Sequence, residues 1–343
     1  MIRRGDFEEW GELMEITINQ NKEGIDEFIK VFKSNSTVER LHIEELFNTK
    51  AYKKLVALFG KNIGLSEKAQ WIDLFYEAYN LHIKAQSYSG EDIIKKNIIA
   101  PVIWAIKNVD ELDSYTNKIM NIINGKEYIR KALKYLPSID CDVEININYY
   151  IFMYNAAVEG NEILIDIAFA NELNSVQLND LLAHEIHHYL KGCINIYKEP
   201  KEGYDDLTLT LRALENEGTA DMCSFEGLNY IYEHFGWMEK GQLEKVLSSF
   251  NEYIEMLNDR FQEKLINNNK SISLYSFIMN NQIVHPLGYK MAFEIKSYLG
   301  IEALKQTVGR PVRFLLSFND AFEESTGKRA FDHRVIEKLR LLY

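Results

Sequence analysis

The sequence predicts an α+β fold that is mainly helical and contains one small antiparallel or mixed sheet. Three observations lead to this fold class. Apolar residues recur at helical spacing through residues 1–140, two segments rich in β-branched and aromatic residues follow at 143–152 and 162–169, and helical patterns continue from Ser175 onward. The change of pattern near residue 140 favours a helical N-terminal region, residues 1–140, followed by a second domain, residues 141–343.

The N-terminal helices are inferred from periodicity and from their end signals. In the segment KEGIDEFIKVFK, Ile25, Phe28 and Phe32 follow the i, i+3, i+7 spacing of one helical face. A further helix is expected to open near Ser66. Pro101 should end or kink the next helix, because proline lacks the N–H group that the helix needs. We therefore expect residues 1–140 to be helical.

The two segments VEININYYIF (143–152) and EILIDIAF (162–169) predict strands, because both are rich in residues that favour extended backbone. A Glu-Gly-Asn sequence between them is typical of a turn, so we expect the two strands to pair antiparallel.

Composition narrows the class of protein. The chain has 343 residues, of which 46% are hydrophobic and 26% charged, as in a water-soluble globular protein. A formal net charge of −12 argues against a nucleic-acid surface, which needs basic residues to neutralise phosphates. The N-terminus lacks the apolar segment of a signal peptide, and no apolar run is long enough to cross a membrane. Three cysteines make a disulfide framework improbable, so we expect a cytoplasmic protein without membrane contacts.

Two histidines one helical turn apart lie in the sequence HEIHH, residues 184–188. On a helix, His184 and His188 project from the same face and can share one zinc ion. Glu185, about 100° round the helix from His184, can instead reach a water molecule at the metal. The alternative is that the histidines are ordinary polar residues of a half-buried helix.

A second motif, ALENEGTADMCSF (213–225), could complete the metal site. A catalytic zinc needs three protein ligands, and Glu217 can be the third. Asp221, four residues later on the same face, can accept a hydrogen bond from a ligand histidine, and the small Gly218 should allow close approach to the first helix. The alternative is a pair of surface acids.

Together, these motifs resemble those of the gluzincin, or thermolysin-like, zinc metallopeptidases. His184, Glu185 and His188 match the first motif, and Asn216, Glu217 and Asp221 match the second. The segment 285–300 also resembles that of predicted zinc-dependent peptidases of bacteria. The resemblance covers about residues 140–320 and leaves residues 1–140 unassigned. His187 departs from it, since an apolar residue is usual there.

The resemblance implies a zincin-like catalytic domain and a mechanism. One Zn²⁺ per chain would be held by His184, His188 and Glu217, with Asp221 and Asn216 supporting the ligands, and Glu185 would act as general base. A tyrosine or histidine would stabilise the oxyanion; Tyr289 is favoured over His285, which is expected just before a helix begins. Either residue can instead be structural. The resemblance also implies that a free edge of strand 143–152 or 162–169 binds the substrate.

We therefore expect zinc-dependent hydrolysis of a peptide or protein substrate. The alternative is a catalytically idle zinc-binding interaction protein that keeps the peptidase fold, although the intact Glu185 argues against it. A DNA-binding regulator is disfavoured by the acidic charge. The N-terminal helices could cap the cleft, and the oligomeric state cannot be read from these patterns.

Overall fold

A computed structural model describes residues 15–34, 37–139, 142–194 and 204–342. The chain forms two compact units: residues 1–127 with 140–181, and residues 128–139 with 182–343. The sequence predicts a domain boundary near residue 140. This boundary, and the assignment of the catalytic domain to residues 141–343, stay predictions. None of the described helices combines the length and hydropathy needed to cross a bilayer.

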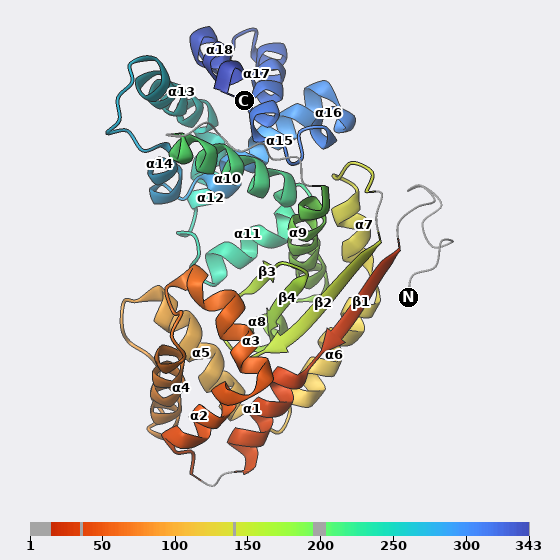
Figure 1. Ribbon diagram of the computed structural model, residues 1–343, viewed down its shortest axis with the longest axis vertical. Coiled ribbons are helices and arrows are strands. Elements are labelled where there is room, and N and C mark those ends of the chain that lie inside the picture. The colour runs from red at the N-terminus through yellow and green to blue at the C-terminus, as the bar shows by residue number, and fades with distance from the viewer. Residues whose placement is uncertain (1–14, 35–36, 140–141, 195–203, 343) are drawn as a thin grey trace. The chain divides into compact units, whose positions relative to one another are not determined.

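The first unit contains the sheet and most of the N-terminal helices (Figure 1). Its elements are β1 (Ile16–Asn21), α1 (Glu23–Ser34), α2 (Arg40–Asn48), α3 (Lys50–Phe59), a 3₁₀ turn (Gly60–Ile63), α4 (Lys68–Ile83), α5 (Ile93–Lys107), α6 (Leu112–Asn124), β2 (Val143–Tyr150), β3 (Ala156–Glu159), β4 (Glu162–Asp166) and α8 (Ile167–Glu172). The fold is thus α+β and mainly helical, as predicted.

The sheet is mixed, with strand order β1-β2-β4-β3. The two predicted strands pair with each other in parallel, with Ile147 opposite Ile163, so the expected antiparallel pairing is wrong. Strand β1, in the region expected to be helical, also pairs parallel to β2, whereas the short β3 turns back antiparallel to β4. Both predicted strands are therefore flanked on each side, and neither has the free edge that was expected to bind substrate.

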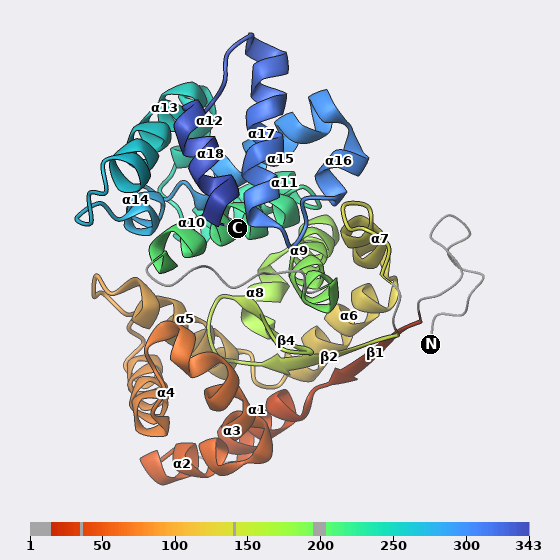
Figure 2. The same ribbon diagram turned by 45° about the horizontal axis from the view of Figure 1, so that its top comes forward.

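Helices cover both faces of this sheet, with α6 and α8 on one face and α1 and α3 on the other (Figure 2). Successive side chains of β2 point to opposite faces of the sheet, and this explains how helices pack on both faces. Tyr149 points to the face where Gln20 contacts the backbone of α6, and Asn148 points to the opposite face, 3.5 Å from Lys54 on α3. Side chains that alternate along a strand supply a packing surface to each helical layer.

Two local features concern the predicted strand 162–169 and the helix that contains Pro101. Asp166 accepts an N–H from Phe169 at 2.8 Å and so caps α8, which ends the strand before residue 169. Pro101, expected to end or kink its helix, lies inside α5 and does not end it. Proline leaves the carbonyl four residues earlier unpaired in a helix, and the N–H of Tyr154 donates to this carbonyl, that of Asn97, at 2.9 Å.

The described residues of the second unit form helices joined by turns and loops, with no strand. Its elements are α7 (Glu127–Leu133), α9 (Ser175–Ile194), α10 (Asp205–Asp221), α11 (Phe225–His234), α12 (Gln242–Ser248), α13 (Phe250–Phe261), a π turn (Gln262–Ile266), α14 (Leu274–Asn280), α15 (Val284–Leu299), α16 (Ile301–Lys305), α17 (Pro311–Thr326) and α18 (His333–Leu342). Residues 175–181 of α9 belong to the first unit, and its residues 182–194 belong to the second. Cys193 is exposed and Cys223 is buried, and Cys141 lies outside the described residues.

Candidate metal centre

Helix α9 places two imidazoles side by side. Asn174 caps its start by accepting the N–H groups of Val176 and Gln177 at 2.9 and 3.0 Å. The buried Ile186 and Leu190 hold the opposite side of the helix in the core. His184 and His188, one turn apart, bring their Nε2 atoms to 2.9 Å from each other. The predicted common face is therefore present.

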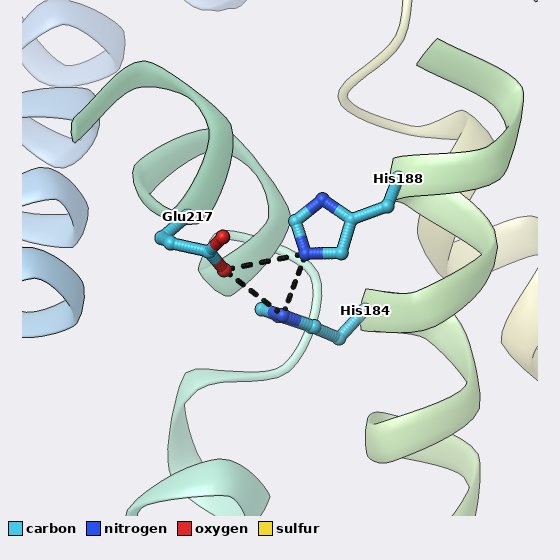
Figure 3. A group of neighbouring side chains, drawn as sticks. All are labelled: His184, His188 and Glu217. Atoms are coloured by element: carbon cyan, nitrogen blue, oxygen red, sulfur yellow. Dashed lines mark hydrogen bonds and ion pairs between the residues drawn. The ribbon is translucent and has the colours of Figure 1, made fainter. Parts of the chain in front are cut away.

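Helix α10 supplies a carboxylate to these two rings. Oε2 of Glu217 lies 3.3 Å from Nε2 of His184 and 3.2 Å from Nε2 of His188 (Figure 3). Among the described residues, these three side chains are the group whose ligand atoms converge closely enough to hold a metal ion. The two successive helices α9 and α10 thus bring together the three residues that the two motifs predicted.

The spacing of the three donor atoms fits zinc. Zinc binds histidine nitrogen and carboxylate oxygen at about 2.0–2.1 Å in tetrahedral geometry, which puts two ligand atoms about 3.3 Å apart. The three distances here are 2.9, 3.2 and 3.3 Å. Two histidines and one glutamate also form a ligand set that leaves the fourth position to water or substrate.

Charges around the donors favour an ionised carboxylate. Burial opposes ionisation of Glu217, but the neighbouring His188 and His285 hold the pKa of its carboxyl well below the usual range. Burial likewise opposes protonation of His184, yet the nearby Asp221 and Glu217 raise the pKa of its imidazole well above the usual value. A cation bound here would replace that proton, so acid should weaken metal binding.

Asp221 lies behind the ligands and faces two histidines. Its Oδ1 is 3.2 Å from Nδ1 of His184, and its Oδ2 is 3.1 Å from Nδ1 of His285. The carboxylate is 1% exposed, and neither Oδ1 nor the His184 Nδ1 has another hydrogen-bond partner among the described residues. This placement suits the predicted role of orienting His184, with its Nε2 toward the metal group.

Glu185 follows the first ligand on α9. Burial raises the pKa of its carboxyl, whereas the positive charges of His184 and His188 oppose that shift. Asn216, next to Glu217 on α10, donates from Nδ2 to Oε1 of Glu217 at 3.0 Å. The roles of general base and of supporting residue that the motifs predict for these two side chains stay predictions.

The two oxyanion candidates occupy different surroundings. His285 lies within the first turn of α15, not before it, and its Nδ1 is 3.7 Å from Oε2 of Glu217. The ring of Tyr289 stacks on that of Phe225, with centroids 3.5 Å apart, and also packs near Phe293. The structure therefore brings His285 into contact with Glu217, whereas the role of oxyanion donor stays a prediction for both residues.

Tyr232 on α11 is a residue of this site that sequence reasoning missed. Its hydroxyl lies 3.0 Å from Nδ1 of His285, and the two rings pack with centroids 4.5 Å apart. Burial raises the pKa of Tyr232 well above the usual value, so the phenol keeps its proton at neutral pH. No motif marks this tyrosine, because nothing in its segment repeats the spacing of the ligand helices.

Gly218 has a different neighbour from the one expected. A Cβ atom there would lie 2.3 Å from the carbonyl oxygen of Gly288, and a Cβ on Gly288 would lie 2.6 Å from the carbonyl oxygen of Leu214. The two glycines thus permit α10 and α15 to cross in backbone contact, whereas we expected Gly218 to serve the approach to α9. This crossing places His285 beside Asp221.

His187 stands apart from the metal group. It is fully buried, and neither ring nitrogen has a hydrogen-bond partner among the described residues. Burial lowers the pKa of this imidazole well below its usual value, so the ring is neutral. Its position agrees with a packing role.

Comparison with protein families adds independent information. The model of the family described as "Putative zinc dependent peptidase (DUF5700)" matches residues 43–327. A search of curated proteins and a search of solved structures found no match. The family match begins well before the motifs, so it includes much of the N-terminal region that the motifs left unassigned. Since it covers most of the chain, this protein belongs to that family of zinc-dependent peptidases.

Proposed function

We propose that this protein is a metallopeptidase of the gluzincin type, which holds one zinc ion with His184, His188 and Glu217 and hydrolyses peptide bonds. The observation that supports this most is the convergence of three donor atoms at 2.9 to 3.3 Å, from the two helices α9 and α10. Zinc bound there would polarise a substrate carbonyl and make a water molecule acidic near neutral pH.

Glu185 acts as the general base in this proposal. Its carboxylate accepts a proton from water as the water oxygen attacks the peptide carbonyl carbon. The C–N bond then breaks, and Glu185 passes the same proton to the departing amine nitrogen. One water is consumed, and a carboxylic acid and an amine are formed.

His285 is our first choice for stabilising the oxyanion. Asp221 engages its Nδ1 at 3.1 Å, which leaves Nε2 as the atom that donates. Burial opposes protonation, but Asp221 and Glu217 together raise the pKa of His285, which favours the proton that this donor needs. Tyr232 can assist through its hydroxyl, and Tyr289 remains the alternative donor.

Elemental analysis combined with cleavage of a fluorogenic peptide library tests the proposal. The purified full-length protein should contain about one zinc per chain and cleave peptides. Glu185→Gln should keep its zinc and lose roughly 10²- to 10⁴-fold in activity, because the amide cannot accept the proton. Glu244→Gln, which changes an exposed carboxyl of α12, should retain both properties.

Two outcomes would contradict the proposal. Protein without zinc after purification and after incubation with zinc salts would remove the metal site. Protein that holds one zinc but cleaves no member of the library would favour the alternative, a zinc-binding interaction protein that keeps the peptidase fold.

A further inference from the structure

A buried ion pair lies beside the metal ligands. On α9, Nζ of Lys191 is 2.5 Å from Oε2 of Glu215 on α10, and the two side chains are 2% and 0% exposed. Burying two opposite charges costs desolvation energy that their attraction often fails to repay. Stability alone is therefore a poor explanation for this pair.

The second oxygen of Glu215 is also engaged. The backbone N–H of Gly309 donates to its Oε1 at 3.0 Å. Gly309 stands just before α17 and has a φ of 71°, a conformation that glycine adopts without strain. Glu215 is thus held from two sides, by Lys191 and by the turn that leads into α17, and this fixes where the ammonium of Lys191 sits.

The ammonium of Lys191 in this position determines how the neighbouring side-chain amide of Asn216 is oriented. Nζ of Lys191 is 3.0 Å from Oδ1 of Asn216. An ammonium group has three donors and no acceptor, so the amide must turn its oxygen to the lysine. The Nδ2 group of Asn216 then faces the other way, and it donates to Oε1 of Glu217 at 3.0 Å.

The amide in turn orients the third metal ligand. With Oε1 of Glu217 bound by Asn216, Oε2 is the oxygen presented to Nε2 of His184 and of His188, at 3.3 and 3.2 Å. We propose that Lys191 is a positioning residue for the zinc ligand Glu217, acting through the amide of Asn216. The inference rests on the proposed zinc site and adds a residue that the ligand motifs do not contain.

Without the ammonium, the amide is free to rotate and to place its oxygen against the carboxylate of Glu217. Glu217 then loses both its restraint and a donor. Outer partners of metal ligands typically contribute about 10- to 100-fold in metal affinity, and we expect a loss of this size for Lys191→Met.

A double-mutant cycle on zinc affinity tests this inference in the full chain. The dissociation constant for zinc is measured by competition with a chelator in the wild type, Lys191→Met, Asn216→Leu and the double variant. Each single variant should bind zinc roughly 10- to 100-fold more weakly, and the double variant no more weakly than the singles, because both substitutions break one path. If the loss of zinc affinity in the double variant equals the product of the losses in the two single variants, the inference is overturned.

Two further variants separate positioning from stability. Lys191→Met combined with Glu215→Gln removes both buried charges, so it leaves none uncompensated and should still show the loss of zinc affinity. Lys264→Met removes the ion pair of Lys264 with Asp206, 3.0 Å long, near the other end of α10, and should leave zinc affinity unchanged. An equal loss in Lys264→Met would show a general effect of destabilisation and would overturn the inference.

Zinc binding by the wild-type protein distinguishes failure of the proposed function from failure of the positioning role. If the wild type does not bind zinc, the proposed function fails. If it binds zinc and all Lys191 variants match it in affinity, only the positioning role fails.

Discussion

At the scale of single residues, the three proposed ligands follow from local spacing. His184 and His188 share one face of α9 because four residues make about one helical turn. Glu217 and Asp221 share a face of α10 for the same reason. Lys191 also lies on this face of α9, seven residues after His184 and three after His188, but neither motif contains it. Tyr232 lies on α11, and only the packing of helices brings it to this site.

The substitution Asp221→Asn tests how a single carboxylate serves two histidines. An amide offers one oxygen and no charge, so it cannot accept from both His184 and His285. We expect zinc affinity to fall about 10- to 100-fold, as it does when the partner of a ligand histidine is removed. Chelator competition measures this fall.

The matched control for this substitution is Asp205→Asn. It changes an exposed carboxyl in the first turn of the same helix and should leave zinc affinity unchanged. Wild-type zinc affinity in Asp221→Asn would show that this carboxylate does not support the ligand.

At the scale of elements, the site depends on how closely α10 and α15 cross. Gly218 and Gly288 meet backbone to backbone, and this contact sets the distance from His285 to Asp221. A methyl group at residue 218 has no room, since the nearest atoms belong to the backbone of Gly288 and cannot rotate away.

Gly218→Ala should therefore destabilise the protein and disturb the site together. Forcing these helices apart is expected to lower the free energy of unfolding by about 1–3 kcal/mol, the range found for overpacked cores. Denaturant unfolding measures this change, and peptide cleavage should fall with it because His285 moves from Asp221.

Gly192→Ala is the control within the metal-binding helix α9. A Cβ at Gly192 meets nothing within 4 Å, and alanine favours a helix by about 1 kcal/mol over glycine. This variant should be at least as stable as the wild type. Equal stability of both alanine variants would contradict the close crossing of α10 and α15.

The sheet shows that local sequence predicted two strands but neither their pairing nor their order. Composition predicted β2 and β4 as strands, because β-branched and aromatic residues favour extended backbone. Their parallel pairing and the insertion of β2 between β1 and β4 depend on contacts between segments far apart in the sequence. The short β1 carries the polar residues Asn19 and Asn21, so it lacked the apolar pattern by which a strand is recognised.

At the scale of the whole molecule, both compact units combine segments that are separated along the chain. The family match, residues 43–327, includes parts of each unit. In the first unit, the buried Asp166 joins β4 to α8 and accepts N–H groups from Phe152 and Phe169 at 2.6 and 2.8 Å. Its titration should therefore affect the stability of the fold.

Burial raises the pKa of Asp166 from 3.8 to about 7, although backbone N–H groups oppose the shift. The folded state then takes up a proton as the pH falls through 7, whereas the unfolded state does so only near 3.8. Stability should consequently rise as the pH falls from 8 to 6, with a contribution from Asp166 of about 1.4 kcal/mol. Chemical denaturation at pH 6, 7 and 8 measures this slope.

If Asp166 causes this dependence of stability on pH, replacing its carboxyl should abolish the dependence. Asp166→Asn should be less stable at every pH, since an amide nitrogen cannot accept the N–H groups, and its stability should lack this contribution. Asp92→Asn, at the exposed N-cap of α5, should keep the wild-type slope. An unchanged slope in Asp166→Asn would contradict the raised pKa.

Local spacing was sufficient to predict a mainly helical fold, two of the four strands and two pairs of side chains with the chemistry of a zinc site. It could do so because helical and extended backbone impose periods of 3.6 and 2 residues on neighbouring side chains. Packing alone decided that the two pairs meet, that His285 contacts Glu217, and that Lys191 reaches Glu217 through Asn216. Such contacts join residues far apart in the chain, and their geometry depends on how closely helices approach, as the glycines of α10 and α15 illustrate.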